Sequence, residues 1–148
     1  MPEKKTLQRA QQDKRQGKAL STQAGEFVKE EMDHVREGKH GARSAKQAIA
    51  IGLSKARRAG VKLPPPEGGS NRTRKQAERD GAKGSNPSRP VSKKRSQAGT
   101  SALKREGHAA ASHTALSRQA HSSAKKRGPA KRSQAAKKAA RTRARKSR

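Results

Sequence analysis

The chain has 148 residues, and its 39 Lys and Arg against 11 Asp and Glu give a formal net charge of +28. Ile, Leu, Val and Phe together number 13, roughly 9% of the residues, whereas compositions below about 20% with a large net charge are typical of disordered chains. One well-packed globular domain over the whole length is therefore excluded. A membrane span is excluded too, because no run approaches about 20 apolar residues.

Basic and apolar residues are distributed in opposite senses along the chain. Residues 1–63 carry 15 basic and 7 acidic residues, whereas residues 64–148 carry 24 basic and 4 acidic ones. Most of the large apolar residues lie in the first half. The sequence therefore predicts a mostly disordered chain with a small all-α element, an αα-hairpin of two amphipathic helices followed by a long basic tail. The expected segments are a basic N-terminal arm (1–20), the hairpin (21–60), a Pro/Gly/Ser-rich linker (61–100) and a Lys/Arg/Ala-rich basic tail (101–148).

Residues 21–37 are predicted to form the first helix of the hairpin, with Ser21 or the adjacent Thr as its N-cap. Its apolar residues recur at i, i+3 and i+4 spacing, as expected for one buried face. Glu31 falls inside this apolar stripe. The favoured interpretation is that Glu31 reaches water at the edge of the hairpin. The alternative is an ion pair with a base such as Lys55 or Arg43, since a buried unpaired carboxylate is too costly.

Residues 44–58 are predicted to form the second helix, and Ser44 with Gln47 makes a capping box at its start. The first helix is acidic and the second is basic, so their faces attract each other within one chain or between two, and a homodimer through the hairpin is one expected outcome. The predicted hairpin core consists of Ala24, Phe27, Val28, Met32, Val35, Ala45, Ala48, Ile49, Leu53 and Ala56.

The basic tail is the strongest functional feature of the sequence. From residue 107 to residue 148 there is no acidic residue, so the tail is a polycation that can follow a phosphate backbone with little base readout. Its Ala-rich part, 101–127, is expected to become helical when phosphates neutralise its charge. The residues expected to contact phosphates are Lys39, Arg43, Lys93, Lys94, Arg95, Lys125, Lys126, Arg127, Lys131, Arg132, Lys137, Lys138, Arg141, Arg143, Arg145 and Lys146.

The turn between the two predicted helices is the candidate for a more defined contact. Lys39 and Arg43 flank the N-terminus of the second helix, where free N–H groups and the helix dipole attract an anion. The two side chains would hold the same phosphate. The alternative is a plain interhelical turn with solvated charges.

Other chemistries find little support. The chain has a single Phe and no Trp or Tyr, so it lacks the aromatic platform on which single-strand binders stack bases. This favours duplex or structured nucleic acid, held by its backbone, over single strands. The chain has no Cys, and its five His residues are not expected to form a set of metal ligands. This holds also for His34 and His40, which lie near Asp33 and Glu37 in the sequence. We therefore expect no metal, no cofactor and no enzymatic activity. The apolar-poor N-terminus predicts no secretory signal.

Two resemblances accompany these observations. The words GKHGARS (38–44) and AIAIGLSKARRAG (48–60) resemble a family of small, basic, uncharacterised bacterial proteins that contain a domain of unknown function. This resemblance covers residues 21–60 and implies a bacterial cytoplasmic setting, but no activity and no site residues. The tail, over about residues 89–148, resembles the tails of linker histones and bacterial histone-like proteins in composition only.

The leading hypothesis is a non-enzymatic, histone-like nucleic-acid-binding protein that contacts duplex DNA phosphates through its polycationic tail. It would be cytoplasmic and nucleoid-associated in a bacterium, or nuclear if the source is eukaryotic. One alternative is an RNA-binding or ribosome-associated basic protein. Another is an adaptor whose hairpin binds a protein partner.

Overall fold

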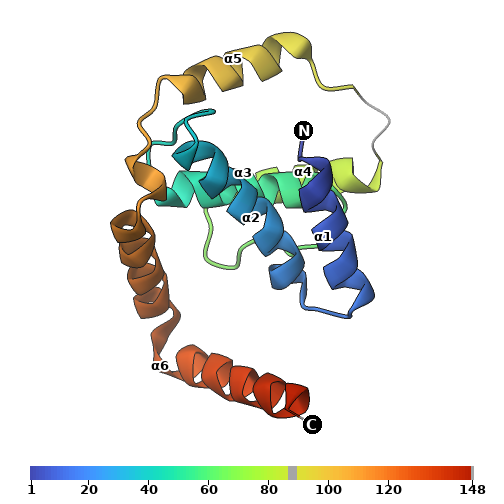
Figure 1. The fold of residues 1–148 in the computed structure, drawn as a ribbon, viewed down its shortest axis with the longest axis vertical. Helices are drawn as coiled ribbons and strands as arrows, with labels where there is room; N and C mark the ends of the chain where they lie inside the picture. Colours follow the sequence, from blue (N-terminus) through green and yellow to red (C-terminus); the bar gives the residue numbers. More distant parts are fainter. Residues whose placement is uncertain (87–89, 148) are drawn as a thin grey trace. The chain divides into compact units, whose positions relative to one another are not determined.

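The computed structural model describes residues 1–86 and 90–147, so residues 87–89 of the expected linker lie outside the described residues. The chain divides into two compact units, Met1–Ser112 and His113–Arg148. Among the described residues, the first unit contains five α-helices and one short 3₁₀ helix, η1, and the second contains one kinked helix (Figure 1). The elements are α1 (Lys4–Arg15), α2 (Leu20–Arg36), α3 (Ala45–Arg58), α4 (Asn71–Ser85), α5 (Lys93–Lys104), η1 (Ala109–Ala111) and α6 (His113–Lys146).

The pairing of α2 with α3 forms the centre of the first unit. Phe27 and Val35 of α2 are 1% and 0% exposed, and Ala56 of α3 is fully buried. The two helices approach closely at Gly52, where a Cβ atom would lie 2.7 Å from the Cα of Val28. Only a residue without a Cβ atom permits this separation, so the glycine determines how tightly the two helices pack.

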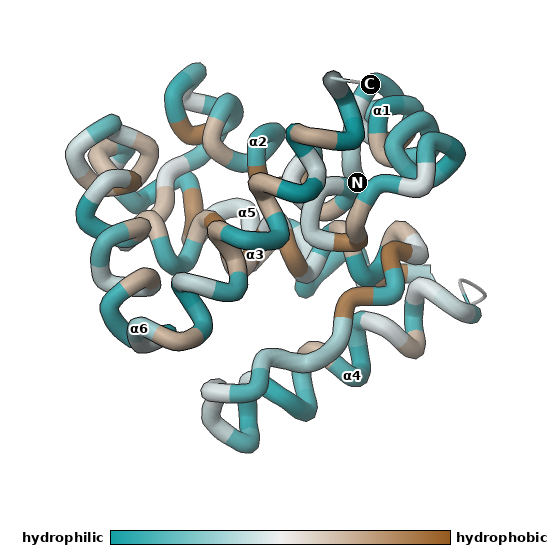
Figure 2. The backbone as a smooth tube through the Cα atoms, turned by 90° about the horizontal axis from the view of Figure 1, so that it is seen from below, coloured by the Kyte–Doolittle hydropathy of each residue, from teal (hydrophilic) through white to brown (hydrophobic). Residues whose placement is uncertain are grey.

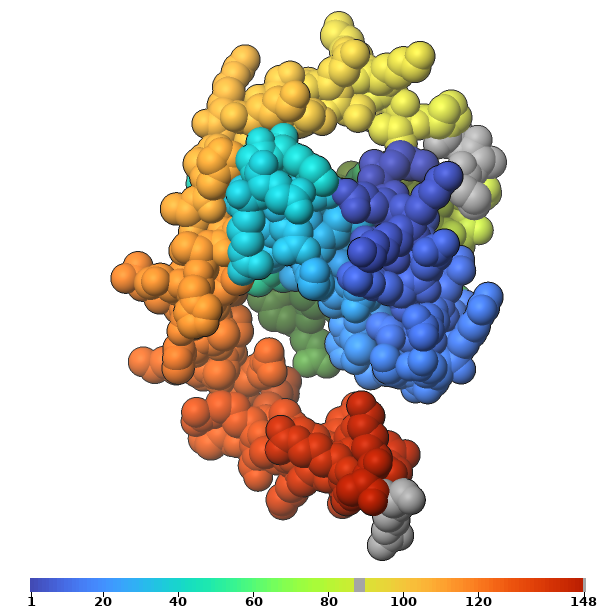
Figure 3. Space-filling view, viewed as in Figure 1, coloured from blue at the N-terminus to red at the C-terminus, as the bar shows by residue number. Residues whose placement is uncertain are grey.

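The N-terminal segment, expected to be a basic arm, is a helix packed against the hairpin. Helix α1 lies against α2, and Figure 3 shows it in dark blue over the neighbouring helix. Ala10 is buried beside Phe27, and Leu7 packs against the same cluster. The backbone N–H of Glu3 also donates to the Glu30 carboxylate across 3.0 Å. Apolar packing together with hydrogen bonds and an ion pair between the two helices thus holds α1 on the hairpin.

Helix α4 packs against α3 through a buried carboxylate. Asp80 is 1% exposed. It accepts hydrogen bonds from Ser54 Oγ (2.6 Å), Arg58 Nε (2.7 Å) and Gln76 Nε2 (3.1 Å). A buried charge is tolerated when it is paired and hydrogen-bonded, and Asp80 meets both conditions.

The turn between α2 and α3 is covered by the segment that follows α5. The N–H of Gly41 donates to the carbonyl of Leu103 (2.9 Å), and the N–H of Ala42 donates to that of Gly107 (3.0 Å). Arg36 Nε donates to the carbonyl of Ala111 in η1 (3.1 Å). Backbone groups left free by the turn are thereby satisfied, so the first part of the expected tail belongs to the fold.

The favoured interpretation of Glu31 is wrong, and the ion-pair alternative is correct. The Glu31 side chain is fully buried, and Lys55 of α3 places its Nζ directly on Oε1. The Nζ of Lys55 also lies 3.3 Å from Oε1 of the neighbouring Glu30. Because η1 and the segment before it cover the turn, the edge of the hairpin at Glu31 is closed to water.

The predicted caps have mixed outcomes. Ser44 Oγ accepts a hydrogen bond from the N–H of Gln47 (3.2 Å), which confirms this N-cap. The Gln47 side chain accepts from the N–H of Arg43 (2.7 Å). The predicted cap of the first helix is wrong, because α2 begins at Leu20 with Ala19 as its N-cap. The helix therefore starts before Ser21, and that residue lies inside it.

The expectation of a mostly disordered chain is also wrong, because α5 and α6 occupy much of the segment expected to be linker and disordered tail. The reason lies in the residue types. Ala, Lys, Arg and Gln have high helix propensity, and a helix satisfies its own backbone hydrogen bonds without a core. Figure 2 shows mostly hydrophilic positions along these helices. Low apolar content therefore limits the size of the core but does not prevent helix formation.

The residues predicted for the hairpin core lie mostly in the interior. Buried are Ala24, Phe27, Met32, Val35, Ala45, Ala48 and Ala56. Val28, Ile49 and Leu53 are half-buried. The core also includes Ala42 in the turn, and it extends beyond the hairpin to Ala10, Val61, Ala77, Ala110 and Ala111. Within the described residues, no helix combines the length and apolar character that crossing a bilayer requires.

Candidate nucleic-acid interface

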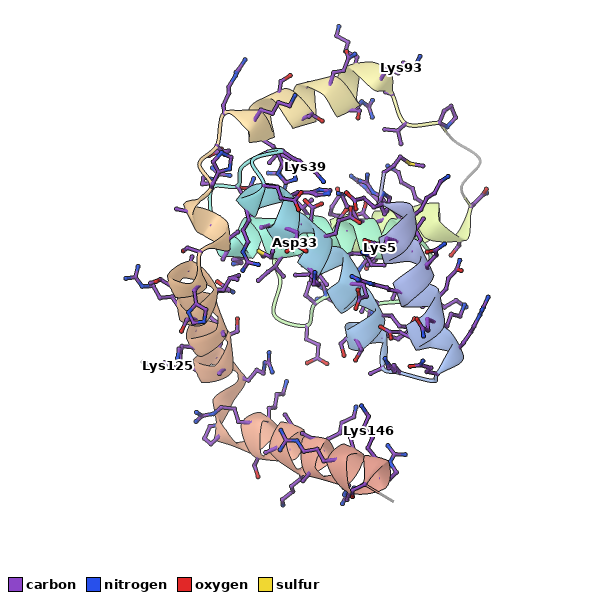
Figure 4. All side chains as sticks on the ribbon, in the orientation of Figure 1. Lys5, Asp33, Lys39, Lys93, Lys125 and Lys146 are labelled. Atoms are coloured by element: carbon purple, nitrogen blue, oxygen red, sulfur yellow. The ribbon has the colours of Figure 1, made fainter. Side chains whose placement is uncertain are left out.

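Helix α6 concentrates the positive charge of the chain. It carries twelve Lys and Arg and no Asp or Glu. Every one of these twelve side chains is exposed, and so is every residue from 129 to 147. Figure 4 shows side chains projecting along the helix, Lys125 and Lys146 among them. The expected phosphate contacts of the tail therefore lie on a helical surface. They are Lys125, Lys126, Arg127, Lys131, Arg132, Lys137, Lys138, Arg141, Arg143, Arg145 and Lys146, and Arg118 joins them.

A kink divides α6 into two helical halves. Gly128 has φ 76° and ψ 169°, and Pro129 follows it. Proline lacks the N–H that would continue the hydrogen-bond ladder and disfavours a helical conformation in the residue before it. Glycine alone adopts this positive φ without strain. Gly128 and Pro129 therefore interrupt the helix, and the basic second half, 130–146, does not continue the direction of the first half.

The second half of α6 is charged around most of its circumference. At about 100° per residue, its eight Lys and Arg spread over about 240°. The remaining arc carries Ala and Ser, so the helix stays narrow. Like charges at i and i+4, such as Lys137 with Arg141 and Arg141 with Arg145, repel one another. A helix charged in this way is bound most favourably by a ligand that presents negative charge to more than one of its sides.

Three of the four basic residues of α5 lie at its first turn. Lys93, Lys94 and Arg95 are all exposed. The N-cap residue, Ser92, makes no side-chain hydrogen bond to the helix. Three cations at the positive end of a helix dipole are electrostatically unfavourable until an anion binds there. This helix start can therefore accept a phosphate.

The two predicted turn residues are not directed to one anion. Lys39 Nζ lies 3.0 Å from Oε2 of Glu37 and 3.1 Å from Oε1 of Glu3. Figure 4 labels Lys39 near the C-terminal end of α2. Its hydrogen bonds to Glu37 and Glu3 raise the pKa of Lys39 above its usual value. Arg43, at the other end of the turn, is exposed. The backbone N–H groups of residues 41–43 already donate hydrogen bonds, to the carbonyls of Leu103 and Gly107 and to the Gln47 side chain. The turn therefore offers little to a phosphate.

The acidic partners near this turn were not anticipated from the sequence. The hydrogen bond from His34 and then those from Lys39 lower the pKa of Glu3 to about 2. Burial alone would raise the pKa of Glu30, but hydrogen bonds from Thr6 and the Glu3 N–H, together with Lys55, lower it below its usual value. The available signal was weak: one acidic residue, Glu3, near the start of the expected basic arm.

The single Phe of the chain, which has no Trp or Tyr, is unavailable for base stacking. Phe27 is 1% exposed within the α1–α2–α3 core. A ligand of the basic helices would therefore be held through charge and backbone contacts rather than stacked bases.

Comparison with known proteins adds one finding. Residues 12–67 match the model of a family of unknown function (DUF6496), which confirms the resemblance drawn from the hairpin words. The matched segment runs from the end of α1 to the Pro-rich segment that follows α3. No curated protein and no solved structure matches the chain.

Proposed function

We propose that this protein binds duplex DNA without catalysing a reaction, and that α6 makes the principal phosphate contacts. The observation that carries the proposal is the set of twelve exposed Lys and Arg on a helix with no acidic residue. Each phosphate that these side chains neutralise releases counterions, which is the main source of non-specific affinity for DNA.

The shape of α6 favours duplex DNA in particular. A helix with its side chains is about 10–12 Å across, and the major groove of B-DNA is about 12 Å wide. Phosphates line both walls of that groove, which suits a helix charged over about 240° of its circumference. Double-stranded RNA has a deep, narrow major groove that does not admit a helix in this way. The first turn of α5 adds a separate phosphate contact.

The test is the affinity of the full chain for a duplex of random sequence, measured by fluorescence anisotropy across a salt series. One variant changes Lys137, Lys138, Arg141 and Arg145 to Gln. A matched control changes the exposed Lys4, Lys46, Lys62 and Lys75 to Gln. If each replaced residue of α6 contacts one phosphate, the negative slope of log affinity against log salt becomes shallower by about 3 to 4. In the control, the slope becomes shallower by less than about 1.

Equal losses in the two variants would contradict the assignment to α6 and leave only diffuse attraction by net charge. A second measurement concerns the nucleic acid. Duplex DNA and folded RNA compete for the chain at equal phosphate concentration. Preference for DNA supports the groove-binding arrangement, whereas preference for RNA replaces this proposal with an RNA-binding function.

A further inference from the structure

The Glu31 carboxylate lies at the centre of a cluster that DNA binding does not use. His34 lies one turn further along α2, and His40 comes from the turn that follows the helix. Glu31 is fully buried, and the two imidazole side chains are each 13% exposed. Their rings stand edge to face, with centroids 5.8 Å apart. Three potential metal ligands from two segments thus meet in a nearly closed site.

Hydrogen bonds orient both imidazoles. His34 Nε2 lies 2.9 Å from Oε1 of Glu3, and His40 Nδ1 lies 3.0 Å from the carbonyl of Gly41. Both partners are acceptors, so these ring nitrogens carry the protons. In neutral rings the lone pairs are then on His34 Nδ1 and His40 Nε2. Those two atoms face Glu31, at 3.8 Å from Oε1 and 3.3 Å from Oε2. A carboxylate or carbonyl behind each histidine is the usual outer shell of metal-binding imidazoles.

The spacing of the donor atoms suits a small transition-metal ion. One nitrogen of each His and one oxygen of Glu31 lie within 4.8 Å of one another. Donor atoms at about 2.0–2.1 Å from a tetrahedral Zn²⁺ are separated by about 3.4 Å. Closure of the wider separations by at most about 1.4 Å would complete the coordination. Neither oxygen of Glu31 receives a well-formed hydrogen bond from the described residues, so both remain able to coordinate.

The neighbouring cation has a second partner. Lys55 pairs with Glu31, and a metal ion would displace its ammonium group from that carboxylate. Glu30 Oε1 lies only 3.3 Å from the same Nζ, and the Glu30 side chain is 3% exposed. Lys55 can therefore remain paired with Glu30 while the divalent cation takes its place on Glu31.

We propose that Glu31, His34 and His40 form a site for Zn²⁺, with Glu3 and the Gly41 carbonyl as its outer shell. Two imidazoles and one carboxylate are a recognised zinc ligand set that leaves a fourth position for water or another ligand. The ion would join α2 to the turn before α3. Because the histidines must be neutral to bind it, its affinity rises with pH.

The experiment uses the full, untagged chain after treatment with a chelator. Zn²⁺ binding is measured by isothermal titration calorimetry, and Co²⁺ serves as a spectroscopic probe through its visible absorption. The expected result is one ion per chain, a tetrahedral Co²⁺ spectrum that Zn²⁺ abolishes, and a higher melting temperature with Zn²⁺. His40→Gln should lose the site, whereas the matched control His121→Gln, which changes an exposed histidine of α6, should keep it.

The outer shell provides a variant that does not depend on the ligands themselves. Glu3 is half exposed, and Glu3→Gln should weaken Zn²⁺ binding by about 10-fold while circular dichroism shows the fold unchanged. Absence of stoichiometric Zn²⁺ binding by the unmodified chain would overturn the proposal, leaving Glu31 in a cluster of ion pairs only. Unchanged affinity in both His40→Gln and Glu3→Gln would overturn it as well.

Discussion

Glu31 of α2 and Lys55 of α3 form an ion pair in the interior of the first unit, with the carboxylate fully buried. The pair joins the two central helices at a point where the apolar stripe of α2 is interrupted by charge. We therefore expect the loss of one partner at this position to lower the free energy of unfolding most.

Removal of Lys55 should be strongly destabilising. Lys55→Ala leaves two buried carboxylates, Glu30 and Glu31, without their shared cation. Breaking a buried ion pair in this way costs about 3–5 kcal/mol of unfolding free energy. Urea denaturation followed by circular dichroism measures it. Lys62→Ala, at an exposed lysine, should change the free energy by less than about 0.5 kcal/mol. Similar values for the two variants would mean that the pair contributes nothing to stability.

The close approach of α2 and α3 predicts opposite effects for two glycines. Gly52→Ala places a Cβ atom 2.7 Å from the Val28 Cα, so the helices must separate, at about 1–3 kcal/mol. Gly25→Ala meets nothing within 4 Å inside α2 and should stabilise the fold by about 0.5–1 kcal/mol. Thermal unfolding of both variants is the measurement. A stable Gly52→Ala variant would show that the helices do not pack as described.

The docking of α4 depends on Asp80. Asp80→Ala removes the shared acceptor of Ser54, Arg58 and Gln76, and we expect a loss of about 2–4 kcal/mol with faster amide exchange in α4. Glu78→Ala, on the exposed face of the same helix, provides the control. Unchanged exchange rates in α4 after Asp80→Ala would contradict the role of this carboxylate.

Acid should weaken the attachment of α1. The pKa values of Glu3 and Glu30 lie below the usual value of 4.5, that of Glu3 at about 2. A depressed carboxyl pKa contributes stability above the unfolded-state value, and this contribution is lost as pH falls through the folded-state value. The free energy of unfolding should therefore decline from about pH 5 to pH 2. The Glu30→Gln variant, measured by urea denaturation at each pH, should show a shallower decline, and an identical pH profile would refute this assignment.

Much of the local structure could be predicted from the sequence. The i, i+3, i+4 spacing predicted the two central helices to within a few residues of their ends, and the Ser44 cap was correct. These features depend on interactions within one or two turns. The helical state of the basic tail was missed because its apolar content was weighed more heavily than its helix propensity.

The candidate sites divide in the same way. The positive charge of residues 113–147 is a property of composition and needs no tertiary structure to be recognised. The proposed metal ligands lie within ten residues of one another in sequence. Even so, only folding could show that Glu31 turns inward and that Glu3, from another helix, reaches His34.

By itself, the sequence determined where helices form, where charge accumulates and which chemistries lack their residues, because these follow from residue type and short-range spacing. Tertiary structure alone decided that α1 covers α2, that the segment after α5 closes the turn, and that Glu31 lies beside Lys55, His34 and His40. Contacts between segments distant in the chain depend on how whole surfaces fit together. A buried carboxylate is stable only where such a fit brings its partners to it.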